Sequence, residues 1–119
     1  MKKVLIVEDD SLLMQMYGET LGVKYQVIKA TDGKTGIEMV KSEHPDLVLL
    51  DIMLPGGMNG FDVLENLKHS EQTKNIPVIV HTSLDSEART AESIGADAYF
   101  VKSKTQLSEL SSNVDELLG

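Results

Sequence analysis

The feature that most constrains the fold of this chain is an unbroken apolar run that ends in a carboxylate. Residues 47–50 are Leu, Val, Leu and Leu, and Asp51 follows them directly. A short continuous apolar run is typical of a strand buried on both faces, as in a parallel sheet covered by helices. Asp51 would then lie at the carboxyl end of the strand, the edge where open α/β sheets bind ligands. An aspartate after a strand is also a common turn residue, so the rest of the chain must decide.

Similar segments recur along the chain. Short apolar runs predict strands, and apolar residues at spacings of three and four predict helices between them. The predicted strands are residues 4–7, 25–30, 46–51, 76–80 and 98–101. The predicted helices are residues 12–21, 33–41, 61–67, 88–94 and 107–118. This alternation predicts one α/β domain over residues 1–119, a flavodoxin-like (βα)5 doubly wound parallel sheet with strand order 2-1-3-4-5.

Residues that cap or break helices support these boundaries. Asp10 or Ser11 can cap the first helix, and Gly22 stands where that helix should close. Pro45 stops the second helix. Residues 55–60 include a proline, an asparagine and several glycines, which predicts an irregular loop after the third strand.

Composition and charge exclude several classes of function. The 119 residues carry a net charge of −8, which argues against direct binding of nucleic acid, because phosphate backbones are held by basic surfaces. No apolar run approaches the roughly 20 residues that a membrane span needs, and no signal peptide precedes the first strand. Cysteine is absent, which excludes disulfides and thiolate metal sites. We therefore expect a cytoplasmic protein without membrane contact.

Polar side chains follow four of the predicted strands at the point where each strand ends. In the order 2-1-3-4-5, the carboxyl ends of these parallel strands meet at one edge of the sheet. The residues that this topology brings together are Glu8, Asp9, Asp51, Thr82 and Lys102. Their convergence favours a functional role for Asp51 over that of a simple turn residue.

Carboxylates gathered at one edge repel one another unless a cation neutralises them. Magnesium fits best, because it prefers oxygen ligands and is commonly held by one or two carboxylates together with a phosphate group. Asp9 and Asp51 would bind Mg²⁺ directly, and the main-chain carbonyl of Met53 would add a ligand. Glu8 would act through water. The spacing of a calcium-binding EF-hand loop is not found in the sequence.

A lysine and a hydroxyl beside a metal-bound carboxylate are groups that phosphoryl transfer requires. Lys102 and Thr82 would offset charge on the phosphoryl oxygens while Asp51 attacks the phosphorus in line. Taken alone, Lys102 could be a solvated charge at a strand end and Thr82 a helix cap. Their coincidence with the acidic residues at the strand ends favours the joint interpretation.

Together these residues resemble the receiver domains of bacterial two-component response regulators, and the resemblance covers the whole chain. It rests on the acidic pair after the first strand, on Asp51 with the glycine-rich loop behind it, on the threonine after the fourth strand, and on the run Tyr-Phe-Val-Lys at residues 99–102. The roles that the resemblance implies are phosphoacceptor for Asp51, acidic pair for Glu8 and Asp9, switch hydroxyl for Thr82, phosphate-binding lysine for Lys102 and switch aromatic for Tyr99.

By the same resemblance, a histidine kinase or a histidine phosphotransfer domain would supply the phosphoryl group, and small donors such as acetyl phosphate could replace it. The chain would catalyse only its own phosphorylation and dephosphorylation, so it would not be an enzyme in the usual sense. Phosphorylation would draw Thr82 toward the phosphate and turn Tyr99 inward, which shifts the population of a bistable element. The face formed by the fourth helix, the fifth strand and the fifth helix would then signal to an unidentified protein target. No output domain is expected within residues 1–119.

Two departures from the family pattern bear on the chemistry. Ser103 follows Lys102 where the family usually has a proline after a cis bond, so this bond is either trans with a slightly displaced lysine or cis and held by the site. Met53 and Leu84 stand where the family helps to orient the hydrolytic water, and neither side chain hydrogen-bonds water usefully. We therefore predict slow self-hydrolysis and a long-lived phosphoryl group.

Two other functions share this fold. A phosphatase with an aspartate nucleophile, of the haloacid dehalogenase type, would have a second acid where Met53 stands. A flavin or nucleotide binder would have a loop rich in glycine or hydroxyl groups after the first strand, where this chain has carboxylates that repel phosphate. The signalling switch is therefore favoured, and His81 is interpreted as an ordinary packed or surface residue.

Overall fold

The computed structural model describes residues 1–119 as a five-stranded parallel sheet flanked by α-helices, and the strand order β2-β1-β3-β4-β5 confirms the predicted fold. The strands are β1 Lys3–Val7, β2 Gln26–Ala30, β3 Leu47–Leu50, β4 Val78–Thr82 and β5 Ala98–Val101. The helices are α1 Ser11–Leu21, α2 Gly33–Glu43, α3 Gly60–Lys68, α4 Ala88–Ile94 and α5 Leu107–Leu118, and a 3-10 turn, Lys102–Lys104, follows β5.

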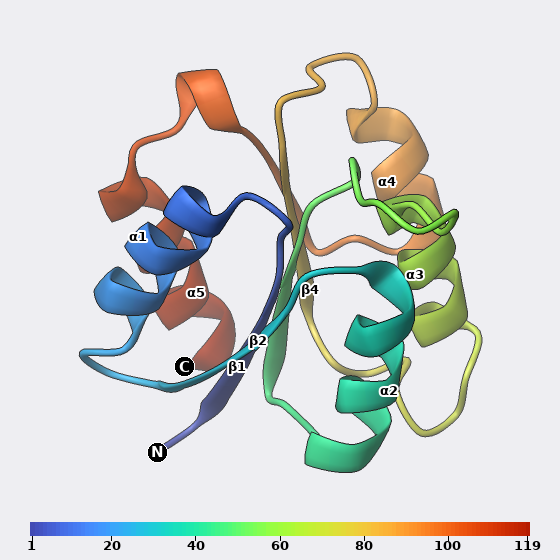
Figure 1. The fold of residues 1–119 in the computed structure, drawn as a ribbon, viewed down its shortest axis with the longest axis horizontal. Helices are drawn as coiled ribbons and strands as arrows, with labels where there is room; N and C mark the ends of the chain where they lie inside the picture. The colour runs from blue at the N-terminus through green and yellow to red at the C-terminus, as the bar shows by residue number, and fades with distance from the viewer.

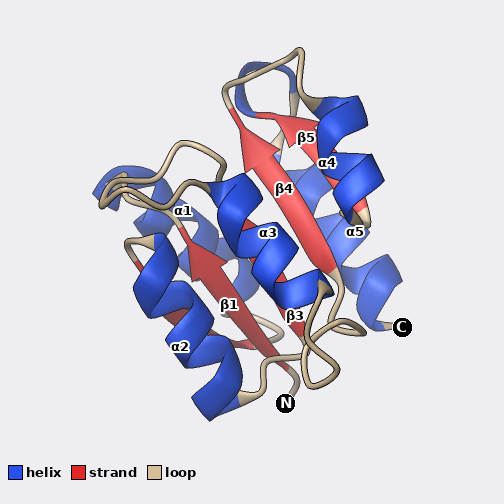
Figure 2. Ribbon diagram, turned by 90° about the vertical axis from the view of Figure 1, so that its right-hand side faces the viewer, coloured by secondary structure: helices blue, strands red, loops and turns tan.

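Two layers of helices cover the sheet. Helices α1 and α5 lie on one side of the strands, and α2, α3 and α4 lie on the other (Figure 1). Figure 2 is seen from the second side, with α2 and α3 in front of the strands. None of the helices combines the length and the apolarity that crossing a lipid bilayer requires.

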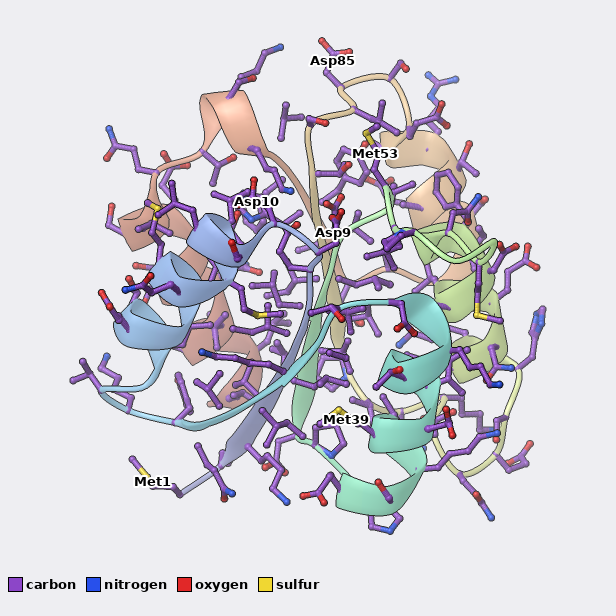
Figure 3. All side chains as sticks on the ribbon, in the orientation of Figure 1. Met1, Asp9, Asp10, Met39, Met53 and Asp85 are labelled. Carbon is purple, nitrogen blue, oxygen red and sulfur yellow. The ribbon has the colours of Figure 1, made fainter.

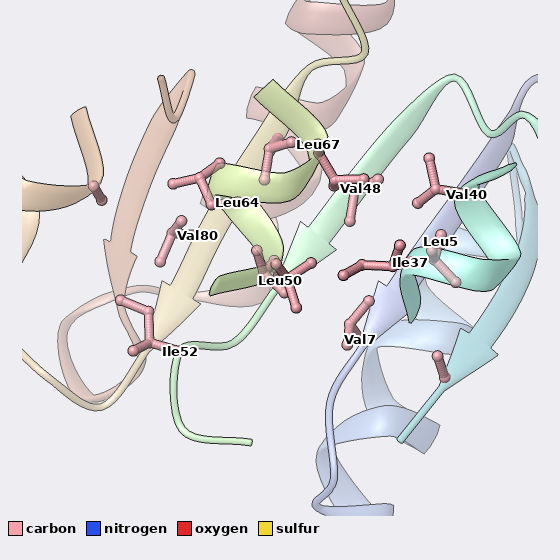
Figure 4. Packing of buried hydrophobic residues seen from close by; sticks show 14 residues of the cluster. Leu5, Val7, Ile37, Val40, Val48, Leu50, Ile52, Leu64, Leu67 and Val80 are labelled. Atoms are coloured by element: carbon pink, nitrogen blue, oxygen red, sulfur yellow. The ribbon is translucent and has the colours of Figure 1, made fainter. Parts of the chain in front are cut away.

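The core is divided by the sheet because successive side chains of a strand point to opposite faces. In β1, Val4 and Ile6 pack with α1 and α5, whereas Leu5 and Val7 pack with α2 and α3. Figure 4 shows the second of these clusters, in which β1, β3 and β4 meet the apolar faces of α2 and α3. Residues on both faces of β1 and β3 are buried, which explains why these strands are continuous apolar runs.

Local chemistry sets the helix ends near the predicted positions. The Asp10 side chain caps α1 by accepting hydrogen bonds from two backbone amides, at 3.0 and 3.1 Å. Helix α2 extends beyond the predicted residues 33–41 to Glu43. It ends at His44, which has a left-handed backbone with φ of 49°, directly before Pro45. Pro45 therefore stops the helix as predicted, but the helix continues to Glu43, two residues before the proline.

Two strand boundaries differ from the prediction. Strand β3 is shorter than residues 46–51, because the aspartates at both ends of that range lie just outside the ladder. Strand β4 is displaced from residues 76–80 to Val78–Thr82, and its last two residues pair with β5. The apolar run does not mark the end of β4, because His81 and Thr82 are polar residues that continue a buried strand. Thr82 thus belongs to the strand itself.

Candidate functional site

The centre of the site is the carboxylate of Asp51, which directly follows β3 and is 5% exposed. Its Oδ2 atom accepts a hydrogen bond from Nζ of Lys102 at 2.8 Å, and its Oδ1 atom accepts one from the backbone amide of Met53 at 3.2 Å. The same Lys102 Nζ lies 2.7 Å from Oε1 of Glu8. One ammonium group therefore links two carboxylates from neighbouring strand ends.

Three carboxylates meet at this edge, as the sequence predicted. Oxygen atoms of Glu8, Asp9 and Asp51 all lie within 4.8 Å of one another. Glu8 is buried and its Oε2 atom accepts the backbone amide of Asp10 at 3.1 Å, whereas Asp9 is exposed. Figure 3 shows Asp9 at the end of β1, toward the same edge as Met53. The cluster is thus open to solvent on the side of Asp9.

The charges in this cluster do not balance within the chain. Burial raises the pKa of Glu8, and the hydrogen bond from Lys102 offsets only part of this effect. Burial acts to lower the pKa of Lys102, but the hydrogen bonds to Asp51 and Glu8 outweigh it, so the pKa of the ammonium is raised. With all three carboxylates ionised, one ammonium leaves two negative charges in excess. A hard dication with oxygen ligands fits this donor set.

Asp9 and Asp51 as the direct ligands of such an ion stay a prediction, because Lys102 contacts Glu8 and Asp51 alike and does not separate their roles. Glu8 remains close enough to contribute through water. The backbone amide of Met53 is tied to Asp51, which brings the residue to the site. Its main-chain carbonyl as a ligand stays a prediction.

Gly60 fixes the loop that follows Asp51, a role that the local sequence pattern does not indicate. Its backbone amide donates to the carbonyl of Ile52 at 2.8 Å. A Cβ atom at Gly60 would lie 2.2 Å from the carbonyl oxygen of Asp51 and 2.5 Å from Cα of Ile52. Asn59 caps α3 here through a reciprocal capping box with Asp62. The start of α3 is therefore packed against the backbone of Asp51.

Thr82 lies at the predicted edge as the last residue of β4, whereas Tyr99 lies within β5 opposite Val80. Neither side chain bonds to Asp51. Thr82 is fully buried, and its hydroxyl accepts a long hydrogen bond from the amide of Leu84 at 3.4 Å. The Tyr99 hydroxyl donates to the carbonyl oxygen of Leu84, and its ring packs against the core cluster between the sheet and α2–α4. Burial raises the pKa of this phenol. The β4–α4 loop thus connects the two candidate switch residues.

A largely apolar cleft of about 540 Å³ opens beside the carboxylates. Its lining residues are Asp9, Ile52, Met53, Leu54, Pro55, Asn59, Phe61 and Leu84. The hydroxyl of Ser83 donates to the sulfur of Met53 at 3.3 Å, which bridges the two loops on either side of the site. Met53 and Leu84, the two side chains that do not hydrogen-bond water usefully, therefore both line this cleft.

The bond between Lys102 and Ser103 is trans, since the chain contains no cis peptide bond. Lys102 begins the 3-10 turn after β5 and still reaches both Asp51 and Glu8. Of the two alternatives that the sequence left open at this bond, the structure has the trans form.

His81 lies under the site rather than in it. The side chain is 5% exposed, and its ring centroid lies 5.2 Å from that of Tyr17 on α1. Neither ring nitrogen has a hydrogen-bond partner. Burial lowers the pKa of His81 to about 4, with a smaller contribution in the same direction from the Lys102 charge. His81 is therefore a packed, neutral residue, in agreement with its interpretation from sequence.

Comparison with known proteins identifies similar chains. A family model described as "Response regulator receiver domain" matches residues 4–115. Protein PilH of Pseudomonas aeruginosa is 39% identical over 90 residues, which are 73% of this chain and 72% of PilH. Polar-differentiation response regulator DivK of Brucella ovis is 33% identical over 104 residues, 85% of this chain and 84% of DivK. The probable transcriptional regulator ycf27 of Porphyridium aerugineum is 34% identical over 104 residues, but these span only 42% of its length.

Solved structures share the fold over nearly the whole chain. A CheY-like response regulator receiver domain protein from Methanospirillum hungatei superposes with a TM-score of 0.90 at 28% identity, covering 99% of this chain and 94% of that one. The BeF3-activated N-terminal receiver domain of RstA from Klebsiella pneumoniae gives a TM-score of 0.87 at 32% identity, covering 98% of each chain.

Proposed function

This chain belongs to the response regulator receiver domain family, and on that premise we propose that it is a phosphorylation-dependent signalling switch that accepts a phosphoryl group on Asp51. The observation that carries the proposal is the pairing of the buried Asp51 carboxylate with Lys102, beside two further carboxylates. A structural ion pair needs no further acids. The excess negative charge is understandable if the site receives a divalent cation together with a phosphoryl group.

Each residue of the site has its own role in the proposed phosphoryl transfer. An oxygen of Asp51 forms the new bond to phosphorus, while the bond from phosphorus to the donor's leaving atom breaks. Lys102, already 2.8 Å from Asp51, offsets charge on the phosphoryl oxygens, and the Thr82 hydroxyl turns to contact one of them. Asp9, Asp51 and the carbonyl of Met53 would hold Mg²⁺, and Glu8 would contribute through water. When bound, Mg²⁺ supplies positive charge against the phosphoryl oxygens.

The proposal extends to partners. The phosphoryl donor is a histidine kinase or a histidine phosphotransfer domain, and the chain catalyses only its own phosphorylation and dephosphorylation, in the cytoplasm. Residues 1–119 act as one receiver domain that signals through α4, β5 and α5 to a protein target. The bond from Tyr99 to the Leu84 carbonyl supports this face as the output, because it ties β5 to the residue whose amide donates to the Thr82 hydroxyl.

Intact mass after incubation with acetyl phosphate and Mg²⁺ tests the proposal. We expect a gain of one phosphoryl group that requires Mg²⁺ and is absent in Asp51→Asn. Asp85→Asn is the matched control, because Asp85 is an exposed acid on the β4–α4 loop. Uptake that survives in Asp51→Asn would contradict the assignment. Rapid turnover of a phosphoester would favour the phosphatase, and a copurified yellow cofactor would favour a flavin protein.

The output side needs a separate experiment. A pull-down that compares untreated protein with protein treated with beryllofluoride should recover a partner in only one of the two states. Equal recovery of the same partner in both states would argue against a phosphorylation-dependent output.

A further inference from the structure

Met53 combines exposure with direct contact to the site. Its side chain is 54% exposed, and its backbone amide donates to Oδ1 of Asp51 at 3.2 Å. The thioether sulfur accepts a hydrogen bond from the Ser83 hydroxyl at 3.3 Å. A sulfur atom is a weak acceptor, so this contact leaves the thioether chemically available. An oxidisable atom therefore stands at the mouth of the phosphoacceptor site.

The other five methionines do not share this placement. Met58 lies on the same loop as Met53, but it is partly buried and packs against the core cluster between the sheet and α2–α4. Met14 is buried in the core at 6% exposure, and Met16 is 38% exposed on α1. Met1 is 85% exposed, but it lies at the opposite end of the molecule from Met53 (Figure 3). Met39 also lies far from the site and is partly buried. Met53 is thus an exposed methionine whose oxidation would change the surroundings of Asp51.

Oxidation of Met53 would make an apolar wall of the cleft beside Asp51 polar. Met53 and Leu84 give one wall of this cleft an apolar surface that offers little to a water molecule. Oxidation converts the thioether into a sulfoxide, whose oxygen is a polar hydrogen-bond acceptor. That oxygen would hold water at the edge of the cleft, two residues from the acyl phosphate that Asp51 would carry.

We propose that Met53 is a redox modification site, where a hydroperoxide oxidises the thioether to the sulfoxide and thereby shortens the lifetime of the phosphoryl group on Asp51. The oxygen–oxygen bond of the peroxide breaks, a sulfur–oxygen bond forms, and the peroxide is reduced to water or an alcohol while sulfur loses two electrons. The change is reversible by methionine sulfoxide reductases. The effect on lifetime rests on the proposed function, whereas the reactivity of Met53 does not.

Peptide mapping after a peroxide time course tests the reactivity on unphosphorylated protein. We expect Met53 to be oxidised about fivefold or more faster than the buried Met14, in the same range as the exposed Met1. Oxidation of Met53 at the rate of Met14 would overturn the proposal irrespective of any phosphorylation.

The decay of the phosphoprotein tests the consequence. Peroxide treatment should accelerate decay by about threefold or more in the wild type and in Met16→Leu. Met53→Leu, which keeps an apolar side chain without sulfur, should decay at its own rate with no response to peroxide. A sulfoxide reductase should restore the slow decay of oxidised wild type.

The outcomes separate the two proposals. Normal phosphoryl uptake with a decay rate that peroxide does not change overturns the redox site and leaves the switch intact. A peroxide response that persists in Met53→Leu also overturns it. Failure of untreated protein to take up a phosphoryl group overturns the proposed function and with it the effect on lifetime.

Discussion

The Nζ atom of Lys102 lies 2.8 Å from Oδ2 of Asp51, although the residue that follows Lys102 is a serine and the bond between them is trans. Lys102 begins a 3-10 turn after β5, and its side chain reaches past β4 to the end of β3. The same ammonium lies 2.7 Å from the buried Glu8. Lys102 therefore holds two strand ends together and also stands where a phosphoryl oxygen would arrive.

Removing the Lys102 charge should destabilise the fold. In Lys102→Met, Glu8 and Asp51 remain buried without their counter-ion, so we expect a loss of about 3 kcal/mol in the free energy of unfolding. Added Mg²⁺ should restore part of the loss, because a dication can neutralise the same acids. Urea denaturation with and without Mg²⁺ measures both effects.

The neighbouring Lys104→Met is the control for that experiment. Lys104 is 70% exposed and lies 3.9 Å from Asp85, so its removal should cost about 0.5 kcal/mol or less. Equal losses in the two variants would mean that Lys102 is not a special counter-ion.

The residue at position 53 should control how long the phosphoryl group lasts. Its thioether cannot orient a water, whereas the amide of Met53→Asn can donate and accept hydrogen bonds at the same place. We expect phosphorylated Met53→Asn to decay several-fold faster than wild type, measured by intact mass after removal of the donor. Met16→Asn, on the surface of α1, should decay as wild type does. Wild-type decay within seconds would contradict the prediction of a long-lived phosphoryl group.

His81 should make the fold less stable in acid. Its pKa falls from an ordinary 6.5 to about 4 in the folded chain, so between these values the unfolded chain binds a proton that the folded chain does not. Stability is therefore lost as the pH falls through this window, by about 3 kcal/mol for this one group. Chemical denaturation across this pH range should show a smaller loss in His81→Phe. A slope unchanged in His81→Phe would contradict the assignment.

Gly60 should tolerate no side chain. In Gly60→Ala the new Cβ would lie 2.2 Å from the Asp51 carbonyl oxygen, so the loop or the strand end must move. We expect a loss of about 3 kcal/mol or more in the free energy of unfolding. Gly18→Ala is the control. Gly18 lies within α1, and a Cβ atom there would meet only the flexible end of the Lys29 side chain, at 3.1 Å. A helix interior favours alanine over glycine, so thermal unfolding should find Gly18→Ala unchanged or slightly stabilised.

The Tyr99 hydroxyl should hold the β4–α4 loop. Tyr99→Phe loses the hydrogen bond to the Leu84 carbonyl, which we expect to cost about 1 kcal/mol. Amide NMR shifts should change around Leu84. Tyr17→Phe should leave those shifts unchanged, because Tyr17 packs beside His81 on the other face of the sheet. Matching shift changes in both variants would mean that the loop does not depend on this bond.

The sequence predicted the sheet well where burial alone decides the residue types. Strands β1 and β3 are buried on both faces, so their apolar runs mark them clearly. Strand β4 was placed two residues too early, because its end is made of His81 and Thr82. These polar residues are buried by neighbours from distant parts of the chain, and a local pattern does not contain that information.

By itself, the sequence determined the alternation of strands and helices and the positions of the acids, the threonine and the lysine at strand ends, because periodicity and turn chemistry are local. Only the tertiary structure decided that Lys102 bridges Asp51 and Glu8, that Gly60 must approach the Asp51 backbone, and that Ser83 contacts Met53. The physical reason is that these are contacts between loops separated in the chain. Their distances depend on how the crossover connections pack on the sheet.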